Sequence, residues 1–575
     1  MLTLGIHPGY HDAAAALFDG YRLVAAVARE RLTRRKGDGR GDVPVDCVDE
    51  VLAIAGVTRR DVDVVASTRS ALPQSLYTHF RGRRAIEGRV RQALDAEKLR
   101  FLALELRRAD SVNALGIIDR AALLDRYGFR DNVDLFFVNH HEAHALPALF
   151  FTDWDEALLY TADGGGDNVQ YSMRGFRDGG LQTLYGGDEE LLRPNRIDSL
   201  GLAYGYCTQA LGWKMNRHEG KLTGLAAYGE PVCFDQMAQQ FHVNQNGEIT
   251  SDFGSYAEMK TFLAGLAEQF SREDLSASIQ QLLEHHVLGS VRRFLTRFPA
   301  RRLGLAGGIF ANVRLNRLLA EETDVDEVFV FPAMGDDGLA VGACLDALRE
   351  RDGFGHWLDQ RYRLDDVYLG RDHGDAIDAA LGSTPGVTVD PGDPIAAAVT
   401  RLTNGQAGAI YTARMEYGPR ALGARTILGN PSDATINDSL NQRLARSEFM
   451  PFAPVVAEED AGEVFEVGDL NRYACRFMTI TCAVKPAWRE RIPAVVHVDG
   501  TARPQVIRRD TNPLYFDILQ GFKQASGLPV LINTSFNVHE EPIVDTPEQC
   551  QRALLDDRVD FVVTQKALYR LAERR

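Results

Sequence analysis

The first 28 residues alternate short apolar runs with tight turns, a pattern that predicts three β-strands in succession. Residues 2–7 and 13–18 have strand length and are joined by a Gly/Pro turn, and an Asp-Gly turn leads to a third run at 21–28. His11 and Asp12 lie where the first turn enters the second strand, a position from which polar side chains can contact a ligand.

A second copy of this pattern lies between residues 156 and 185. Residues 157–161 form an apolar run that leads into Asp-Gly-Gly-Gly-Asp at 163–167, followed by a strand, an Asp-Gly turn and another strand. Two such units indicate an internal duplication, although two unrelated hairpins with Asp-Gly turns would show the same pattern. The glycines allow the backbone to approach a phosphate or a metal-bound ligand closely.

Strands and helices alternate further along the chain. Residues 271–298 have the spacing of an amphipathic helix that packs on a core. Residues 303–312 predict a strand, a glycine turn and a helix start, and such a turn can hold a nucleotide against its backbone. Residues 329–332 predict another strand, and Gly-Asp-Asp-Gly at 335–338 opens a helix whose acidic pair either caps it or binds a metal.

Two histidines four residues apart are candidate metal ligands. If the stretch after residue 138 is helical, His140 and His144 share one face, and Asp163 and Asp336 can supply carboxylates. Two imidazoles with carboxylates suit a divalent transition metal such as iron or zinc. The spacing is not that of a zinc protease, because one residue instead of two separates the glutamate from the second histidine. Histidines that cap a helix or fill a core remain the alternative.

The length of 575 residues indicates roughly two to four domains. A boundary is expected near residues 353–366, where a helical pattern ends and a polar stretch follows. We therefore divide the chain into residues 1–358 and 359–575.

Composition narrows the class of protein. Hydrophobic residues at 45% and charged residues at 25% describe an ordinary globular protein, and the net charge of −16 argues against a dedicated nucleic-acid binder. Seven cysteines without a CxxC pair, no signal peptide and no long apolar run predict a cytoplasmic protein that does not enter a membrane. The arginine-dense segment 81–108 predicts solvated helices with basic faces, with an RNA-contacting face as the alternative.

Arginines in glycine-flanked turns mark the second part of the chain. They lie in residues 414–425 and 501–505, and a Ser/Thr/Asn-rich turn follows at 533–537. Such a set is what a polyphosphate or carboxyphosphate pocket requires. Surface arginines that pair with the protein's own carboxylates are the alternative. The Gly-Lys pair at 220–221 is not a Walker A loop, because the first glycine and the final Ser/Thr are missing.

Taken together, these motifs resemble known families. The opening hairpin, the Asp-Gly-Gly-Gly hairpin and the Ala-Gly-Gly-Ile-Phe-Ala-Asn turn resemble the phosphate and adenosine motifs of the ASKHA (actin, sugar kinase, heat-shock) fold. The cluster at 140–144 with Asp-Asp-Gly at 336–338 resembles the metal site of the tRNA threonylcarbamoyladenosine transferases. The whole chain, including Glu-Tyr-Gly-Pro-Arg-Ala-Leu-Gly at 416–423, is similar to the NodU/CmcH family of O-carbamoyltransferases.

The resemblance implies an α/β protein with two active sites. Residues 1–358 would form a duplicated ASKHA-type domain, and residues 359–575 a YrdC-like α/β domain. The YrdC-like domain would convert carbamoyl phosphate and ATP into carbamoyladenylate. The first domain would then transfer the carbamoyl group to a hydroxyl of a natural product, such as an antibiotic or its sugar. A possible homo-oligomer is compatible with the sequence, and neither a membrane nor a nucleic acid is expected as a partner.

The resemblance also assigns residues. The metal, ferrous iron (Fe2+) or a similar divalent ion, would be held by His140, His144, Asp163 and Asp336. His11 would be the general base for the acceptor, with Lys36 as a charge partner. Adenylate contacts would come from Glu219, Gly220, Gly307, Gly308 and Asn312. In the second domain the ligands of ATP, Mg2+ and carbamoyl phosphate would be Arg414, Arg420, Arg425, Arg446, Arg503, Ser535 and Asn537.

The chain departs from the family pattern at two places. Ala143 replaces the glycine of the HxEGH motif, which should not disturb metal ligation. Arg-Ser-Glu-Phe-Met at 446–450 replaces Arg-Glu-x-Phe-Arg, and this puts the phosphate contacts of that loop in doubt. Two other classes share parts of this pattern: a tRNA-modifying threonylcarbamoyl transferase, and an ASKHA-type small-molecule kinase or a non-catalytic regulator. The sequence does not specify the acceptor.

Overall fold

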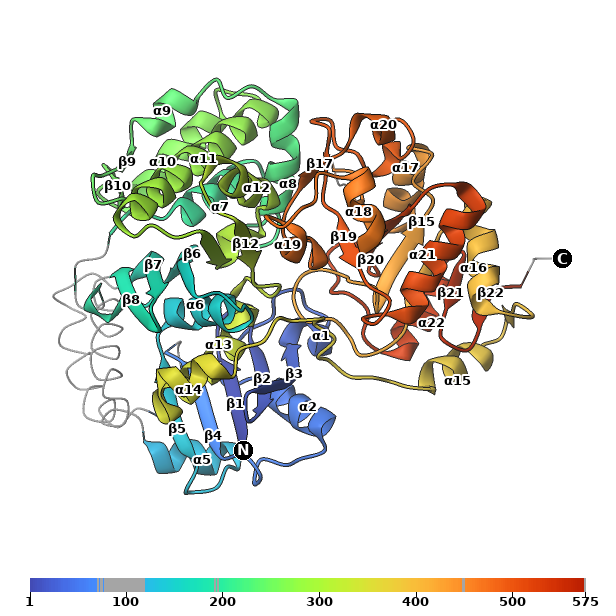
Figure 1. Ribbon diagram of the computed structural model, residues 1–575, viewed down its shortest axis with the longest axis horizontal. Helices are drawn as coiled ribbons and strands as arrows, with labels where there is room; N and C mark the ends of the chain where they lie inside the picture. Colours follow the sequence, from blue (N-terminus) through green and yellow to red (C-terminus); the bar gives the residue numbers. More distant parts are fainter. Residues whose placement is uncertain are drawn as a thin grey trace.

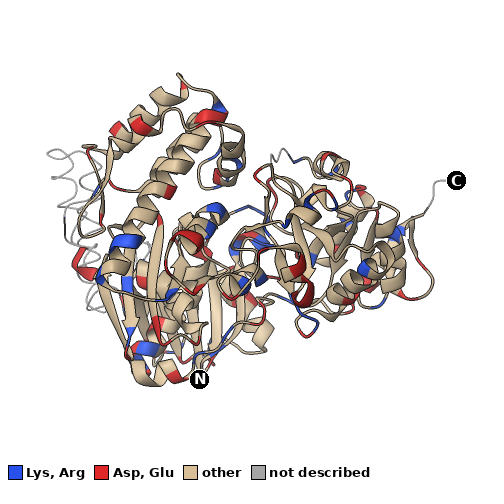
Figure 2. Ribbon diagram, turned by 45° about the horizontal axis from the view of Figure 1, so that its top comes forward, with Lys and Arg blue, Asp and Glu red and all other residues tan. Residues whose placement is uncertain are grey.

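The computed structural model describes residues 1–69, 72, 76, 119–190, 193, 196–446 and 450–572 (Figure 1). The basic helices predicted for residues 81–108 lie outside these ranges. None of the described helices combines the length and apolar character needed to cross a membrane. Figure 2 shows acidic and basic residues interspersed over both parts of the molecule.

Two five-stranded sheets with the same topology form the first part of the molecule. The first sheet has the order β3-β2-β1-β4-β5 and the second the order β8-β7-β6-β11-β12. In each, the first three strands in sequence are antiparallel, the fourth pairs in parallel with the first, and the fifth pairs in parallel with the fourth. The predicted internal duplication is therefore confirmed.

The strand bounds match the hydrophobic pattern closely. The first sheet contains β1 Leu2–His7, β2 Ala14–Asp19, β3 Arg22–Ala28, β4 Val64–Thr68 and β5 Asp134–Val138. The second contains β6 Glu156–Gly166, β7 Val169–Arg177, β8 Gly180–Tyr185, β11 Arg302–Ala306 and β12 Glu327–Val330. Strand β6 continues through the glycines at 164–166, where the sequence predicts a turn.

Helices α6 His140–Phe150 and α13 Leu339–Asp352 pack on each other. Helix α6 also packs against strands of the second sheet, and α13 packs against strands of the first. A Cβ on Gly342 would lie 1.7 Å from the carbonyl oxygen of Ala143, so the backbones of the two helices approach to a distance that only glycine permits. This close contact brings the N-terminal ends of both helices, and the polar residues there, to one place between the sheets.

A helical region follows the second hairpin. It contains α7 Leu200–Ala210, α8 Glu219–Leu225, α9 Phe234–Ala238, α10 Tyr256–Ala267 and α11 Arg272–Arg297, with the short strands β9 Phe241–Val243 and β10 Ile249–Ser251. The side chain of Ser271 caps α11 by accepting a hydrogen bond from the Asp274 N–H. The amphipathic helix predicted for residues 271–298 is thus confirmed.

The second part contains an eight-stranded sheet of order β13-β22-β21-β14-β15-β20-β16-β19. Its strands are β13 Val387–Val389, β14 Gly408–Tyr411, β15 Arg425–Gly429, β16 Ala453–Ala457, β19 Gln505–Ile507, β20 Val530–Ser535, β21 Phe561–Val563 and β22 Leu568–Leu571. Helices α16 Pro394–Thr403 and α21 Pro513–Ser526 pack on each other beside it. Figure 1 shows this part, in orange and red, lying beside the two sheets of the first part.

The two parts share buried apolar contacts. One cluster joins Phe331 and Ala333 of the first part to Tyr417, Leu422 and Tyr473 of the second. The last helix of the first part, α14 Phe354–Asp359, ends 28 residues before β13 begins at Val387 (387 − 359). The division at residues 358/359 stays a prediction, because the intervening chain still packs on the first part through Leu364, Val367 and Leu369.

Candidate functional site

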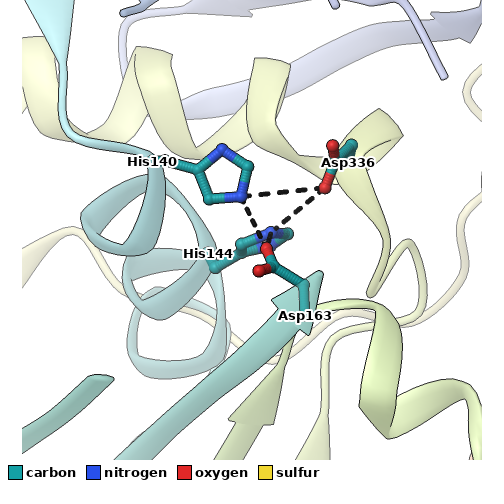
Figure 3. Close-up of side chains that lie close together, drawn as sticks. All are labelled: His140, His144, Asp163 and Asp336. Carbon is teal, nitrogen blue, oxygen red and sulfur yellow. Dashed lines mark hydrogen bonds and ion pairs between the residues drawn. The ribbon is translucent and has the colours of Figure 1, made fainter. Parts of the chain in front are cut away.

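The predicted metal ligands converge between the two sheets (Figure 3). His140 and His144 lie on the first turns of α6, Asp163 lies on β6, and Asp336 begins the short helical turn η5 Asp336–Gly338 after β12. The nearest pair is His140 Nε2 and Asp163 Oδ2 at 2.6 Å. His144 Nε2 lies 3.2 Å from Asp163 Oδ2 and 3.5 Å from Asp336 Oδ1. One ligand atom from each of the four residues lies within 4.8 Å of the others.

These four side chains fit a divalent metal. His144 Nε2 is buried and faces the Asp163 and Asp336 carboxylates without a hydrogen bond of good geometry to any described residue, an arrangement that a metal between these atoms would satisfy. Burial alone would raise the pKa of the Asp163 and Asp336 carboxyls, but the neighbouring histidines lower both below the usual value. Two imidazoles and two carboxylates are a donor set for a divalent metal such as iron or zinc, and such a metal would take the place of the proton on His140 Nε2.

The backbone around the cluster is held by further polar side chains. The N-cap residue of α6, Asn139, accepts hydrogen bonds from the N–H groups of His141 and Glu142, and the N–H of His140 donates to Asp167 at 2.7 Å. Burial alone would lower the pKa of His140, but Asp163 raises it to about 9. The start of the helix is therefore fixed in the orientation that directs His140 and His144 toward the carboxylates.

Two of the residues between His140 and His144 have partners of their own outside the four candidate ligands. Glu142 pairs with Arg174 at 2.8 Å and Arg349 at 2.9 Å, so its carboxylate is occupied by two guanidinium groups. His141 is fully buried, with Nε2 3.0 Å from the Val169 carbonyl oxygen. Asp336 is the first residue of its short helical turn and does not cap it. The N-cap position is taken by Gly335, which has no side chain to form a cap bond. This favours a metal ligand over a helix cap.

His11 lies beside this cluster. Its Nδ1 is 3.0 Å from Asp12 Oδ2 and 3.8 Å from Asp336 Oδ2, and its side chain is 44% exposed. The hydrogen bond to Asp12 raises the pKa of His11 to about 9. His11 is thus the solvent-accessible histidine next to the candidate metal ligands.

Sequence reasoning missed His7. It is the last residue of β1, is buried, and places Nε2 3.8 Å from Asp336 Oδ2 while Nδ1 lies 3.0 Å from Thr68 Oγ1. Burial lowers its pKa to about 4. The sequence did contain a signal for His7, because it is a histidine at the end of a strand and directly before Pro-Gly. Residues at the ends of central strands lie at the edge of the sheet where ligands commonly bind.

Lys36 is exposed, and its charge acts on Glu540 of the second part. His218, His539 and Glu540 form a second group with metal-like spacing at this contact between the parts. However, the Lys214 N–H donates to His218 Nδ1 at 3.1 Å, which leaves the His218 proton on Nε2, 2.5 Å from Glu540. His218 therefore offers no lone pair to a metal, and the group is a hydrogen-bonded contact between the two parts.

The predicted nucleotide turn forms as expected. Gly307 has a φ of +99°, and a Cβ there would lie 2.2 Å from the Ala162 carbonyl oxygen, whereas no described heavy atom lies within 4 Å of a Cβ on Gly308. Asn312 begins α12 Val313–Glu322 as its N-cap and donates to Gln280 at 2.8 Å and Thr223 at 3.4 Å. The turn therefore exposes one glycine beside an ordered amide.

Residues 219 and 220 begin the helix that contains Thr223, so they lie on the same side of the molecule as Asn312. Burial raises the pKa of Glu219, and its carboxylate accepts the N–H of Asn216 at 2.6 Å. A Cβ on Gly220 would meet no described atom within 4 Å. The structure thus brings α8 next to the nucleotide turn.

A cavity of about 330 Å³ lies between the two parts. Helices α11 and α12 contribute Glu284, Arg314 and Arg317, and the second part contributes His497, Thr501 and Arg503. Arg503 thus lies on the wall of an interdomain cavity, opposite two arginines of the first part.

Three other predicted residues of the second part contact one another directly. Arg446 donates from Nη2 to Ser535 Oγ at 3.1 Å and to Asn537 Oδ1 at 2.8 Å, and from Nη1 to Thr534 Oγ1 at 2.7 Å. The two turns that contain these residues are far apart in sequence, so this arginine fixes their relative position.

The remaining arginines contact mainly backbone. Arg425 is fully buried, stacks 3.7 Å above the Tyr411 ring and donates to the Thr412 carbonyl at 2.6 Å. Arg414 donates to carbonyl oxygens of residues 24, 369 and 370 at 2.6–2.8 Å. Arg420 reaches the carbonyl oxygen of Ala311, in the nucleotide turn of the first part, at 3.4 Å. These residues do not gather in one pocket, and Arg414 lies between the two parts of the molecule.

Comparison with known proteins places these features in context. Two family models match the chain: Carbamoyltransferase N-terminus over residues 2–345 and Carbamoyltransferase C-terminus over residues 399–570. Nodulation protein NolNO of Sinorhizobium fredii is 32% identical over 570 residues, covering 96% of this chain and 78% of that protein. Nodulation protein U of the same organism is 27% identical and covers 92% of each chain.

Solved structures are more distant. Full-length HypF in its phosphate- and nucleotide-bound form covers 62% of this chain and 47% of that chain, with a TM-score of 0.33 and 13% identity. Component A of (R)-2-hydroxyglutaryl-CoA dehydratase from Acidaminococcus fermentans covers 61% of this chain and 99% of that chain, with a TM-score of 0.34 and 15% identity.

Proposed function

The chain belongs to the carbamoyltransferase family, and from this premise we propose that it is an ATP-dependent O-carbamoyltransferase with two active sites. Residues 1–358 would be an ASKHA-type domain, and the two sheets of equal topology support this. Residues 359–575 would be a YrdC-like domain built on the eight-stranded sheet.

The second part would carry out the activation. Carbamoyl phosphate would lose its phosphate with water, and the resulting carbamate would attack the α-phosphorus of ATP, giving carbamoyladenylate and pyrophosphate. Arg503 on the cavity wall, and Arg446 with Ser535 and Asn537, would bind the phosphates, with Mg2+ accompanying ATP. The location of the cavity between the two parts supports a short route for the adenylate from one part to the other, which would limit its hydrolysis by water.

The first part would carry out the transfer. Gly308, Asn312 and the start of α8 would bind the adenosine group, next to the site where His140, His144, Asp163 and Asp336 would hold the metal. A bound divalent metal supplies a Lewis acid for the carbamoyl carbonyl. In its neutral form, which a pKa of about 9 makes the majority only at alkaline pH, His11 would accept the proton of the acceptor hydroxyl at its Nε2, because Nδ1 is engaged by Asp12. The hydroxyl oxygen would then attack the carbamoyl carbon, and AMP would leave.

The observation that carries this proposal is the buried group of two histidines and two aspartates, to which both halves of the duplication contribute. Among the described histidines near this group, His11 is the one that solvent can reach. The acceptor would be a hydroxyl of a natural product, such as an antibiotic or its sugar. This acceptor class is our proposal.

The proposal is tested by incubating the protein with ATP, carbamoyl phosphate, Mg2+ and ferrous iron and analysing the products by mass spectrometry. We expect pyrophosphate and carbamoyladenylate without any acceptor. Folded, metal-loaded protein that forms neither product would refute the proposal. A phosphorylated acceptor without pyrophosphate would indicate a kinase, and modified tRNA would indicate a threonylcarbamoyl transferase.

A further inference from the structure

We propose that Tyr417 of the second part is a positioning residue for the metal-binding turn of the first part. This inference rests on the proposed metal centre. The Tyr417 hydroxyl donates a hydrogen bond to the carbonyl oxygen of Asp337, the residue directly after the candidate ligand Asp336. Tyr417 is only 3% exposed, and its backbone N–H donates to the Val367 carbonyl at 2.9 Å, so both its backbone and its hydroxyl are held.

The residue after Tyr417 contacts the other side of the same turn. Gly418 has a φ of +102°, and a Cβ there would lie 2.9 Å from the carbonyl oxygen of Pro332. Arg31, which is buried, donates to the Gly418 carbonyl at 2.6 Å and holds it in place from the first part. Tyr417 and Gly418 therefore contact the segment 332–337 at both of its ends, and this segment carries Asp336.

Backbone hydrogen bonds hold part of the turn, from the Gly307 N–H to the Met334 carbonyl oxygen at 2.7 Å and from the Gly338 N–H to the Gly335 carbonyl oxygen at 3.0 Å, but side chains hold it at few points. The short helical turn η5 has no side-chain cap at its N-terminus. Asp336 reaches the histidines at 3.5–3.8 Å without a direct hydrogen bond to them. Its position is therefore set by the backbone of the turn, and the Tyr417 hydroxyl is the side-chain donor from the second part that binds this backbone.

The loop that contains Tyr417 and Gly418 is also held by the side-chain carboxylate of Glu416. Glu416 Oε1 accepts the N–H groups of Leu422, Ala424 and Arg425 at 2.9, 2.7 and 2.9 Å. This fixes the segment that contains Arg420 and Arg425, two of the predicted phosphate ligands. One loop of the second part thus contacts the metal-binding turn and also positions these two arginines.

The physical consequence concerns metal affinity. Coordination distances tolerate only about 0.2 Å of displacement, and removing a group that orients a ligand typically weakens metal binding about 10- to 100-fold. Without the Tyr417 hydroxyl the Asp337 carbonyl would lose its interdomain partner, and the turn would relax away from the histidines. Metal binding should therefore weaken although no ligand is changed.

The test compares Tyr417→Phe with Tyr473→Phe in the full-length protein. Tyr473 is a matched control: it is also 3% exposed and donates to a carbonyl of the first part, that of Phe151 at 2.7 Å, but Phe151 lies past the opposite end of α6 from the histidines. Zn2+ and Fe2+ dissociation constants are measured by competition with a chromophoric chelator, and thermal unfolding verifies that each variant is folded.

We expect Tyr417→Phe to bind metal about 10- to 100-fold more weakly than the wild type, and Tyr473→Phe within about threefold of it. Gly418→Ala is a second variant, expected to weaken metal binding similarly because its Cβ would push the loop away from Pro332. Equal metal affinity in Tyr417→Phe and Tyr473→Phe would overturn the role of Tyr417 and leave the proposed metal centre intact. A wild type that binds no divalent metal would overturn the proposed metal centre as well.

Discussion

Replacing Gly166 by alanine is expected to weaken metal binding while the protein remains folded. Gly166 is the last residue of β6, and a Cβ there would lie 2.2 Å from Cγ and 2.4 Å from Cδ2 of the His140 ring. Ordinary van der Waals contact begins at 3.4 Å, so the ring or the strand would have to move by about 1.2 Å (3.4 − 2.2). The effect is steric, because Gly166 does not have a positive φ.

The magnitude follows from this displacement. Inserting a methyl group into a filled site typically costs about 1–3 kcal/mol of folding free energy, which a protein of this size can tolerate. A shift of about 1 Å is several times the tolerance of about 0.2 Å for a metal–ligand distance. His140 would therefore be lost as a ligand or held poorly, and metal affinity should fall at least about tenfold, equivalent to about 1.4 kcal/mol.

The matched control is Gly164→Ala, two residues earlier on the same strand. A Cβ on Gly164 would lie 3.6 Å from a methyl group of Leu202, which is ordinary contact. The assay is chelator competition for Fe2+ or Zn2+, with chemical unfolding of the metal-free proteins to measure the folding cost separately. Metal affinity in Gly166→Ala equal to that in Gly164→Ala would refute the role of His140 as a ligand.

Three further variants separate the remaining roles. His11→Ala should keep adenylate formation but lose carbamoyl transfer by about 100-fold or more, measured with an acceptor found by screening; equal loss of both half-reactions would contradict its role as the base. Arg414→Met should lower the free energy of unfolding by about 1–3 kcal/mol and leave KM for ATP unchanged, because the guanidinium of Arg414 donates to backbone carbonyls. A raised KM for ATP would instead indicate that Arg414 binds a phosphate. Burial raises the pKa of Asp198 from its usual 3.8 to about 6, so the folded protein binds this proton more tightly than the unfolded chain and loses stability as pH rises from about 4 to 6. Relative to wild type, Asp198→Asn should therefore be more stable by up to about 3 kcal/mol at pH 8 and no more stable at pH 4, as urea unfolding at the two pH values would show.

Local structure could be predicted from the sequence where the signal itself is local. The alternation of apolar runs with Asp-Gly turns predicted both hairpins, and the spacing at 271–298 predicted helix α11. Strand β6 extends through three glycines because Gly166 pairs with Val169 at the end of the hairpin after a shift in register, and a run of glycines does not show such an irregularity in advance.

The candidate site depended on contacts between distant residues. His140 and His144 were recognisable by their spacing, but Asp336 joins them from about 190 residues away, and only the family resemblance paired these residues. His7 was missed because, at the end of an apolar strand, it carries no spacing signal of its own. The contacts of Arg414 could not be predicted either, since its acceptors are backbone carbonyls, which every residue has.

Two separate sites imply that activation can proceed without the metal ligands, and a comparison of wild type with His144→Ala measures this most directly. Each protein is incubated with ATP, carbamoyl phosphate and Mg2+, and pyrophosphate and carbamoyladenylate are quantified together with the bound divalent metal. We predict equal adenylate formation in both proteins, with metal bound only by the wild type. Loss of adenylate formation in folded His144→Ala, or its absence from the metal-loaded wild type, would contradict the two-site mechanism.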